Sequence, residues 1–141
     1  MREILFKAKR VDNGEWVDGY YQKRYDLLGN EEHLIFHADS YTVWEYAEID
    51  PETLCQFTGL YSKNGKRIWE NDIVNTKSNV RVQIKFGLYS NGFSTWKHNQ
   101  GFYMDFMDKE YYRPELGYWA EKTVVIGNIF DNKELLQEER R

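Results

Sequence analysis

The chain contains one cysteine, two prolines and three histidines among its 141 residues. A single cysteine excludes an internal disulfide and a thiolate metal cluster, and Cys55, beside Leu54 and Phe57, is expected to be a small buried hydrophobic residue. No apolar run approaches the roughly 18 residues of a membrane span, and the opening MREILFKAKRVD has no apolar run of secretory length. We therefore expect no membrane contact and a cytoplasmic location in the cell that carries the gene.

Signatures of catalysis and of cofactor binding are missing as well. The serines lie in or beside predicted turns, and none has the glycine elbow of a G-x-S-x-G nucleophile. Gly59 and Gly65 are turn glycines without the Lys-Ser/Thr pair and the helix of a phosphate loop. His33 and His37 would lie about 13 Å apart on a strand, too far to share a metal ion. The sequence thus favours a protein that is not an enzyme and that binds no metal or other cofactor.

Aromatic residues make up 17% of the chain, which is high, whereas the hydrophobic fraction of 41% is slightly low. Because each aromatic side chain buries a large area, a core of few residues can suffice, and we expect no disorder despite 30% charged residues. The net charge of −4 argues against a protein that coats nucleic acid along its whole surface.

Most of the chain is predicted to form short strands joined by turns. Two strand pairs come first, with a hairpin turn at Asp12-Asn13-Gly14 in the first pair and a loop over 25–32 between the pairs. Asp50 can then cap a single helical turn that begins with Pro51. The strands of the two pairs are expected at 4–9, 15–21, 33–37 and 41–46.

The second half begins with the strongest hairpin signal of the chain, Asn64-Gly65. Both residues are predicted to adopt positive φ in a two-residue turn. Strict alternation of apolar and polar residues over 80–86 predicts a strand with one buried face, and the apolar run 123–129 predicts another buried strand. The side chains predicted to be buried on these strands are Val82, Ile84, Phe86, Val124 and Ile126.

Polar and aromatic residues over 108–122, interrupted by Pro114 and Gly117, favour an ordered excursion outside the core. Asp131, with Glu134 three residues later, predicts a short helix. The expected fold is mainly β in one domain. An antiparallel meander over about 1–72 is followed by a small, partly open SH3-like barrel over about 73–130 and a C-terminal helix over about 131–138.

Two stretches carry a family signature: DPETLCQFTGLYSKNGKRIWENDIV at 50–74 and VVIGNIFDNKELL at 124–136. They resemble the YopX family, small proteins encoded by phages and prophages of Gram-positive bacteria. The resemblance covers nearly the whole chain and implies a phage or prophage accessory protein in a bacterial host, from a family with no established biochemical activity. Asp72 occupies the Asp of the family's Asp-Ile-Val. Asn71 stands where glycine is expected, which argues against a very tight turn at that point.

Glu70 and Asp72, with Asp50 and Glu52, form an acidic group that a paired acid–base site or a divalent-metal site could use. A spacing of two on a strand would place Glu70 and Asp72 on the same side. The simpler interpretation is structural, since a carboxylate at Asp72 can satisfy backbone groups of a turn. The residues expected to have structural roles are Asn64, Gly65 and Asp72.

No acidic residue occurs from Ile73 to Met104, where basic and aromatic residues are interleaved. Small barrels that bind single strands combine cations for the backbone with aromatic rings on which bases stack. This acid-free stretch could therefore bind single-stranded nucleic acid, or it could be an ordinary solvated face. The residues expected to contact nucleic acid are Lys77, Arg81, Lys85, Trp96 and Lys97.

The first half of the chain carries an excess of acidic residues, and opposite charge in two halves can support head-to-tail self-association. The aromatic surplus also exceeds what one small core can bury. The sequence thus favours a non-catalytic protein-interaction or assembly module that forms a homo-oligomer, with a phage or host protein as a further potential partner. The alternative is a single-strand nucleic-acid-binding protein that uses the acid-free stretch.

Overall fold

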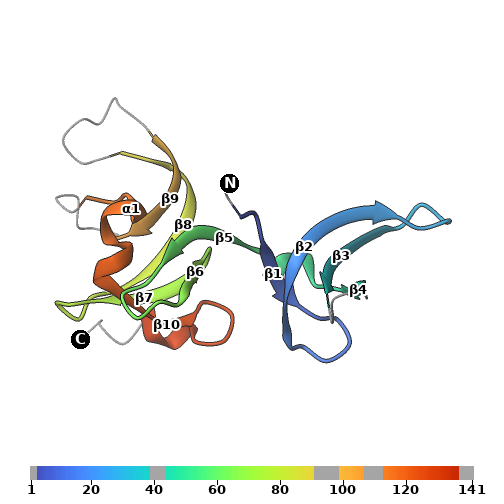
Figure 1. Cartoon of the computed structure of the whole chain (residues 1–141), viewed down its shortest axis with the longest axis horizontal. Coiled ribbons are helices and arrows are strands. Elements are labelled where there is room, and N and C mark those ends of the chain that lie inside the picture. Colours follow the sequence, from blue (N-terminus) through green and yellow to red (C-terminus); the bar gives the residue numbers. More distant parts are fainter. Residues whose placement is uncertain (1–2, 39–43, 91–98, 107–112, 137–141) are drawn as a thin grey trace. The chain divides into compact units, whose positions relative to one another are not determined.

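The computed structural model describes residues 3–38, 44–90, 99–106 and 113–136. The chain divides into two compact units, Met1–Phe57 and Thr58–Arg141, each built on antiparallel strands (Figure 1). The mainly-β class is thus confirmed, while the internal division lies at residues 57–58 instead of the expected boundary near 72. No helix in the described ranges is long and apolar enough to cross a membrane.

Unit 1 holds strands in the order β4-β3-β2-β1-β5, and the predicted N-terminal meander is confirmed. Its elements are β1 Phe6–Lys9, β2 Trp16–Tyr25, β3 Glu31–Ala38, β4 Trp44–Glu48, the short η1 helix Pro51–Thr53 and the first part of β5, Cys55–Tyr61. As the sequence predicted, Pro51 begins the helical turn and Asp50 caps it, since Asp50 Oδ1 accepts a hydrogen bond from Glu52 N at 3.0 Å. A cluster of buried side chains lies at Ala8, Ile35 and Ile49.

Strands β2 and β3 run on beyond the rest of unit 1 as a two-stranded ribbon (Figure 1). β1 pairs with β2 only over residues 16–19, and β4 pairs with β3 only over residues 34–38. Residues 24–25 therefore pair with residues 31–32, while His33 O also accepts a hydrogen bond from Ile49 N. The loop predicted over 25–32 is shorter for this reason, because only Asp26–Asn30 lie outside the strands.

Unit 2 holds a four-stranded sheet in the order β10-β7-β8-β9, and β6 pairs with the second part of β5. The sheet is open, with β9 and β10 at its edges, so the partly open arrangement is confirmed while SH3-like kinship stays a prediction. The C-terminal helix is a single 3-10 turn. The elements are β6 Arg67–Trp69, β7 Asp72–Thr76, β8 Arg81–Tyr89, β9 Asn99–Asp105, α1 Leu116–Trp119, η2 Ala120–Lys122, β10 Thr123–Asn128 and η3 Lys133–Leu136.

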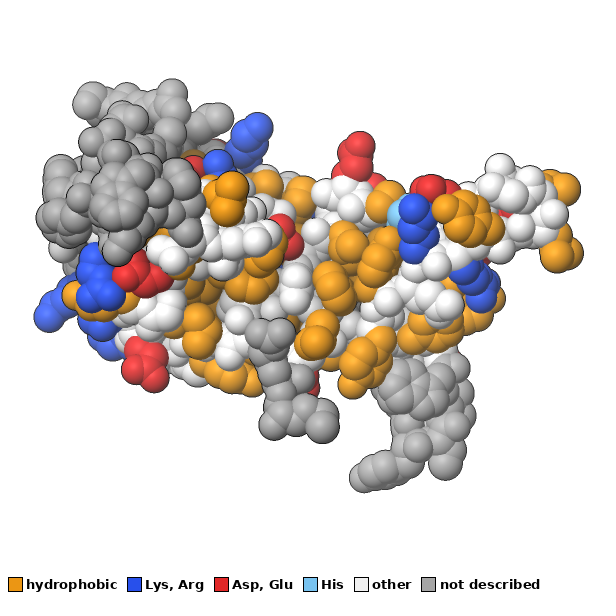
Figure 2. Space-filling view, turned by 90° about the horizontal axis from the view of Figure 1, so that it is seen from above, with side chains coloured by type: hydrophobic (Ala, Val, Ile, Leu, Met, Phe, Trp, Pro, Cys, Tyr) orange, Lys and Arg blue, Asp and Glu red, His pale blue; other side chains and the backbone are white. Residues whose placement is uncertain are grey.

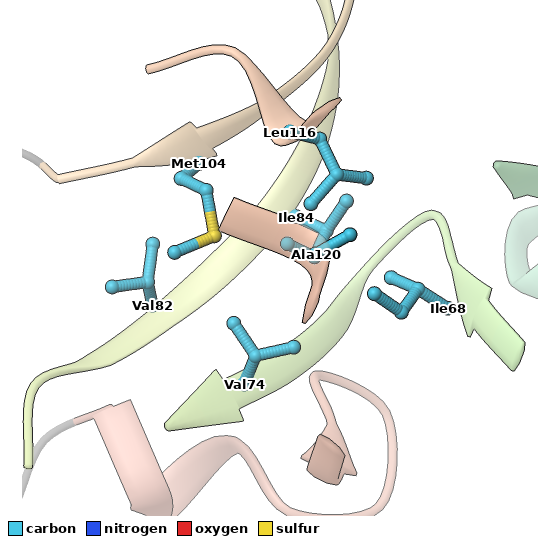
Figure 3. Close-up of a cluster of buried hydrophobic side chains, with 7 residues drawn as sticks. All are labelled: Ile68, Val74, Val82, Ile84, Met104, Leu116 and Ala120. Atoms are coloured by element: carbon cyan, nitrogen blue, oxygen red, sulfur yellow. The ribbon is translucent and has the colours of Figure 1, made fainter. Parts of the chain in front are cut away.

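The core of unit 2 lies between this sheet and the short helices α1 and η2 (Figure 3). Leu116 and Ala120 are at most 2% exposed, so the prediction that 108–122 lies outside the core is wrong for these two residues. Their spacing of four places them on one face of a helical turn, which is the signal that could have revealed them. The buried cluster consists of Ile68, Val74, Val82, Ile84, Met104, Leu116 and Ala120.

Burial on the two predicted core strands is only partly as expected. Val82 and Ile84 are buried, but Phe86 is 48% exposed. Asn71 N, just before β7, donates to Ile84 O, and beyond Ile84 β8 continues with β9 and leaves the core. Val124 and Ile126 are half-buried, and the register of β10 shifts between residues 125 and 127, which breaks the regular alternation.

The hairpin between β5 and β6 confirms the predicted turn but not its type. Ser62 N donates to Lys66 O at 2.7 Å and Gly65 N donates to Ser62 O at 3.0 Å, so the loop has three residues. Gly65 has a φ of 79°, whereas Asn64 does not have positive φ. The expectation of positive φ at both residues is therefore wrong, because a type I turn followed by a left-handed glycine needs only Gly65 in that conformation.

Candidate functional site

Arg81 and Lys85 project from one face of β8, as the alternation of the strand predicted. Lys85 Nζ lies 2.8 Å from Asp105 Oδ2 on the neighbouring strand β9. This hydrogen bond raises the pKa of Lys85 above its ordinary value. Asp105 follows directly after the acid-free stretch, so strand pairing brings a carboxylate to a face that carries none in the sequence window.

Arg81 also has a partner that is distant in the sequence. Its Nη1 donates to the carbonyl oxygen of Leu135 in η3, at 3.3 Å. Tyr89 and Tyr103 lie on the same face as Lys85, with ring centroids 5.4 Å apart, and both are half-buried. Both cations on this face therefore already have a bonding partner within the chain, and an aromatic pair lies beside Lys85.

The other residues expected to contact nucleic acid are not brought to this face. Lys77 lies in the turn between β7 and β8 and lines a pocket. Val80 in the same pocket continues the alternation of Val82 and Ile84, so the pocket opens on the side of the sheet opposite to Arg81. Trp96 and Lys97 lie outside the described residues.

This pocket, called here the Trp119 pocket, belongs entirely to unit 2 and has a volume of about 380 Å³. Its apolar lining comes from Val80, Phe106 and Trp119, and the two aromatic rings have centroids 5.3 Å apart. Trp119 is held in place because its Nε1 donates to Arg113 O at 2.6 Å. The remaining lining residues are polar or charged: Lys63, Thr76, Lys77, Ser78, Glu121 and Lys122.

Three lysines and one glutamate give the Trp119 pocket a cationic lining. Lys122 is engaged locally, since its Nζ donates to Tyr118 O at 2.9 Å and lies 4.2 Å from the centroid of the Tyr118 ring. Lys63 and Lys77 are exposed and have no ion-pair partner within the described ranges. These two ammonium groups can therefore take an acidic partner without first breaking a contact.

The turn that carries Lys77 is closed by the chain's own hydrogen bonds. Thr76 N donates to Val80 O at 3.0 Å, and Asn79 N donates to Thr76 O at 2.9 Å. Thr76 Oγ1 accepts from Val80 N at 3.1 Å, and Asn79 has a φ of 64°, a left-handed conformation that asparagine tolerates. One wall of the pocket is thus a fixed turn.

The tip of the β2–β3 ribbon, residues Asp26–Asn30, is a second feature that the sequence did not single out. Asp26 Oδ1 accepts hydrogen bonds from Leu28 N at 2.9 Å and from Asn30 N at 2.8 Å. Asp26 N donates to Asn30 O, and Gly29 N donates to Asp26 O. Within this closed turn Leu27 is 104% exposed and Leu28 is 87% exposed. Two leucines are thus held in solvent by a well-bonded turn.

The residues weighed as reactive groups have structural contacts. His33 Nδ1 lies 2.6 Å from the hydroxyl of Tyr21, and His33 Nε2 lies 3.3 Å from Glu31 Oε2. Cys55 is buried and its thiol donates to Thr53 O at 3.3 Å. In the described part of the chain no three His, Cys, Asp or Glu side chains are grouped so as to hold a metal ion.

The two residues of the acidic pair in the family signature, Glu70 and Asp72, do not share a strand, because β7 begins at Asp72. Glu70 and Asn71 form the turn between β6 and β7, so the same-side argument for Glu70 and Asp72 does not apply. Asp72 is 3% exposed, and its Oδ2 accepts a hydrogen bond from Trp69 N at 2.8 Å, the turn role that the sequence favoured. Asn71 has a φ of 71°, so the tight turn forms with asparagine in place of glycine, against the sequence expectation.

Comparison with known proteins gives a family and a fold. The family model described as YopX protein matches residues 5–137. No curated protein matches the chain. Among solved structures, the chain is similar to the crystal structure of protein EF1440 from Enterococcus faecalis, with 22% sequence identity and a TM-score of 0.53 over 96% of this chain and 99% of that chain. At that identity the likeness shows the fold alone.

Proposed function

The chain belongs to the YopX family, and we propose that it is a phage or prophage accessory protein that acts through protein–protein contacts as a homo-oligomer in the bacterial cytoplasm. The observation that carries this proposal is the exposure of large apolar side chains on both units, visible as orange surface in Figure 2. Exposed apolar side chains that gather in one place are typical of protein-interaction sites, and Leu27 and Leu28 lie next to each other at the ribbon tip. The exposed residues are Ile4, Val11, Tyr20, Tyr25, Leu27, Leu28, Tyr46, Tyr61, Phe86, Leu88 and Tyr118.

A role without catalysis is supported by where the candidate reactive groups are used. Asp72 is committed to a backbone N–H, His33 to Tyr21 and Glu31, and the Cys55 thiol to a carbonyl oxygen. A catalytic acid, base or nucleophile must lie in a pocket, within hydrogen-bond distance of the substrate. These three groups stabilise local structure instead.

Light scattering coupled to size-exclusion chromatography tests the proposal, over about 1–100 µM protein, a range that spans moderate association constants. We expect a mass above that of the 17.0 kDa chain, with a fraction that rises with concentration. A monomer across the whole range would overturn the homo-oligomer.

The second candidate is binding of single-stranded nucleic acid, favoured by Lys85 beside the Tyr89–Tyr103 pair. Fluorescence anisotropy with mixed-sequence single-stranded DNA at low salt tests it. If this face binds, affinity falls steeply with salt, and Arg81→Glu with Lys85→Glu abolishes it while Lys66→Glu with Lys133→Glu does not. Absence of binding at tens of micromolar protein would remove this candidate, and the ion pair of Lys85 with Asp105 already weakens it.

A further inference from the structure

The ribbon tip and the Trp119 pocket are complementary in chemistry. The tip presents two exposed leucines and one carboxylate, that of Asp26, while the pocket offers an apolar lining and three lysines against one glutamate. Apolar side chains that enter an apolar pocket leave water at little polar cost, and opposite charges at the rim orient the approach. The pocket volume of about 380 Å³ lies in the range that accepts small apolar groups.

We propose that Leu27 and Leu28 at the ribbon tip of one copy insert into the Trp119 pocket of a second copy, so that copies of the chain associate head to tail. This inference rests on the proposed self-association and assigns the two surfaces that make it. Because tip and pocket are different surfaces, each contact is heterologous, and copies associate as a reciprocal dimer, a ring or a chain.

The geometry of the tip favours this role because little order has to be gained on binding. The turn Asp26–Asn30 is already closed by hydrogen bonds from Leu28 N and Asn30 N to the Asp26 carboxylate. Preorganised side chains lose less entropy on association than those of a flexible loop. Lys63 and Lys77, which lack ion-pair partners in the described ranges, supply the complementary charge at the pocket.

Two double variants separate the surfaces. Leu27→Ser with Leu28→Ser removes the apolar tip, and Lys63→Glu with Lys77→Glu reverses the charge at the pocket. All four side chains are exposed, so both variants should fold like the wild type, which circular dichroism and thermal unfolding check. Removing two leucines from a buried contact should weaken association on the order of a hundredfold or more.

Matched controls carry the same kind of change elsewhere. Val11→Ser removes an exposed apolar side chain from the other turn of unit 1, where Val11 is 61% exposed. Lys66→Glu with Lys133→Glu reverses two exposed lysines that do not line the pocket. We expect both controls to assemble like the wild type in sedimentation velocity runs, and dissociation of either control would overturn the assignment.

Mixing the two double variants gives the decisive result. Each is expected to be monomeric alone, but the tip variant retains an intact pocket and the pocket variant an intact tip. The mixture should therefore form one-to-one heterodimers and stop there. Two variants that stay monomeric when mixed, or a tip variant that assembles normally, would overturn the inference while leaving self-association intact.

A covalent trap tests proximity directly. Leu28→Cys in one copy and Ser78→Cys in another should form an intermolecular disulfide under mild oxidation, because Ser78 lines the pocket. The buried Cys55 should not compete. Cross-linking no faster than for a Val11→Cys and Ser78→Cys mixture would overturn the inference. If the wild type is a monomer at every concentration, the proposed self-association itself fails.

Discussion

The two units build antiparallel sheets of similar kind but cover them differently. In unit 2 a helical turn lies over the sheet, and Leu116 and Ala120 join five further buried side chains, Ile84 among them. In unit 1 the buried cluster around Ile35 consists of Ala8, Ile35 and Ile49, and two strands run on as a ribbon. Unit 1 also buries side chains outside this cluster, among them Leu34, Cys55 and Phe57. The units therefore differ in how their buried residues are grouped, and unit 1 in addition extends a ribbon outward.

The strand pairs that extend beyond the rest of their sheets, β2–β3 in unit 1 and β8–β9 in unit 2, also differ in their contacts. The ribbon of unit 1 is stabilised by ion pairs, with Lys23 Nζ 3.1 Å from Glu31 Oε1 and Arg24 Nη2 3.5 Å from Glu32 Oε2. The extension of β8 with β9 is stabilised by rings, with the centroids of Phe86 and Phe102 4.9 Å apart. Because exposed ion pairs add little stability, the ribbon gains less from its cross-strand contacts than a buried strand pair does.

Truncation of one isoleucine in each core is expected to have the largest effect on stability. Ile84→Ala should lower the free energy of unfolding by about 2–5 kcal/mol, because the other residues of its buried cluster cannot close the cavity. Ile35→Ala should fall in the lower part of that range, since its cluster is smaller. Urea denaturation measures both. As a control, Gln83→Ala on the opposite face removes a single hydrogen bond to Asn71 and should cost about 1 kcal/mol. Equal losses at Ile84 and Gln83 would refute the register of β8.

Alanine at one glycine in each unit compares a position with steric overlap, Gly19, with a position that has backbone strain but open space, Gly65. A Cβ at Gly19 would lie 2.2 Å from the backbone oxygen of Phe36, so Gly19→Ala must push β3 away and should cost about 3 kcal/mol. Gly65 has open space around it. Gly65→Ala should therefore lower the free energy of unfolding by about 1–2 kcal/mol, the cost of a left-handed conformation for alanine. Thermal unfolding compares the two. A smaller loss at Gly19 than at Gly65 would contradict the close packing of β2 on β3.

Phe86→Ala tests whether the end of β8 leaves the core. With Phe86 48% exposed, its removal should cost about 0.5–1.5 kcal/mol, mainly the contact with the Phe102 ring. The loss at Ile84 should be clearly larger in the same denaturation series. Similar losses at the two positions would restore the buried Phe86 that the sequence predicted.

The smallest expected effect is the change that salt produces in the pKa values of two turn carboxylates of unit 1, Asp26 and Asp12. Hydrogen bonds from Asn30 N and other backbone groups lower the pKa of Asp26, and the Arg10 side chain lowers the pKa of Asp12. Because both folded pKa values lie below the ordinary 3.8, their contribution to stability is present above that pH and is lost as pH falls through the folded pKa. In NMR titrations, 0.5 M salt should raise the pKa of Asp12 more than that of Asp26, since salt screens an exposed ion pair. An equal rise of the two pKa values would argue against backbone hydrogen bonds as the main cause of the low pKa of Asp26.

Residue types predicted several features of the turns correctly where the interacting residues are close together in the sequence. Pro51 after Asp50 gave the helical turn, and Gly65 gave the left-handed turn residue. Asp72 was expected to bond turn backbone groups, and its Oδ2 accepts from Trp69 N, three residues away. Each of these interactions spans a few residues, so the residue types alone favour the structure.

The candidate functional residues could not be grouped in this way. In the sequence Lys85 belongs to the acid-free stretch, but its partner Asp105 comes from β9, and Arg81 donates to a carbonyl oxygen 54 residues away. The Trp119 pocket collects side chains from the end of β7, the β7–β8 turn, α1 and η2, which no single sequence window contains. The tip leucines lie in a stretch expected to be a loop, where the sequence does not show that the turn is closed.

The sequence by itself determined the mainly-β class, the family and the positions of the tight turns, because alternation and turn chemistry act over a few residues. The tertiary structure decided which charges are paired, that Phe86 is exposed while Leu116 is buried, and that lysines gather around an aromatic pocket. Those outcomes depend on which strands pair and where the pairing ends. They are set by contacts between segments far apart in the chain, and no local pattern encodes them.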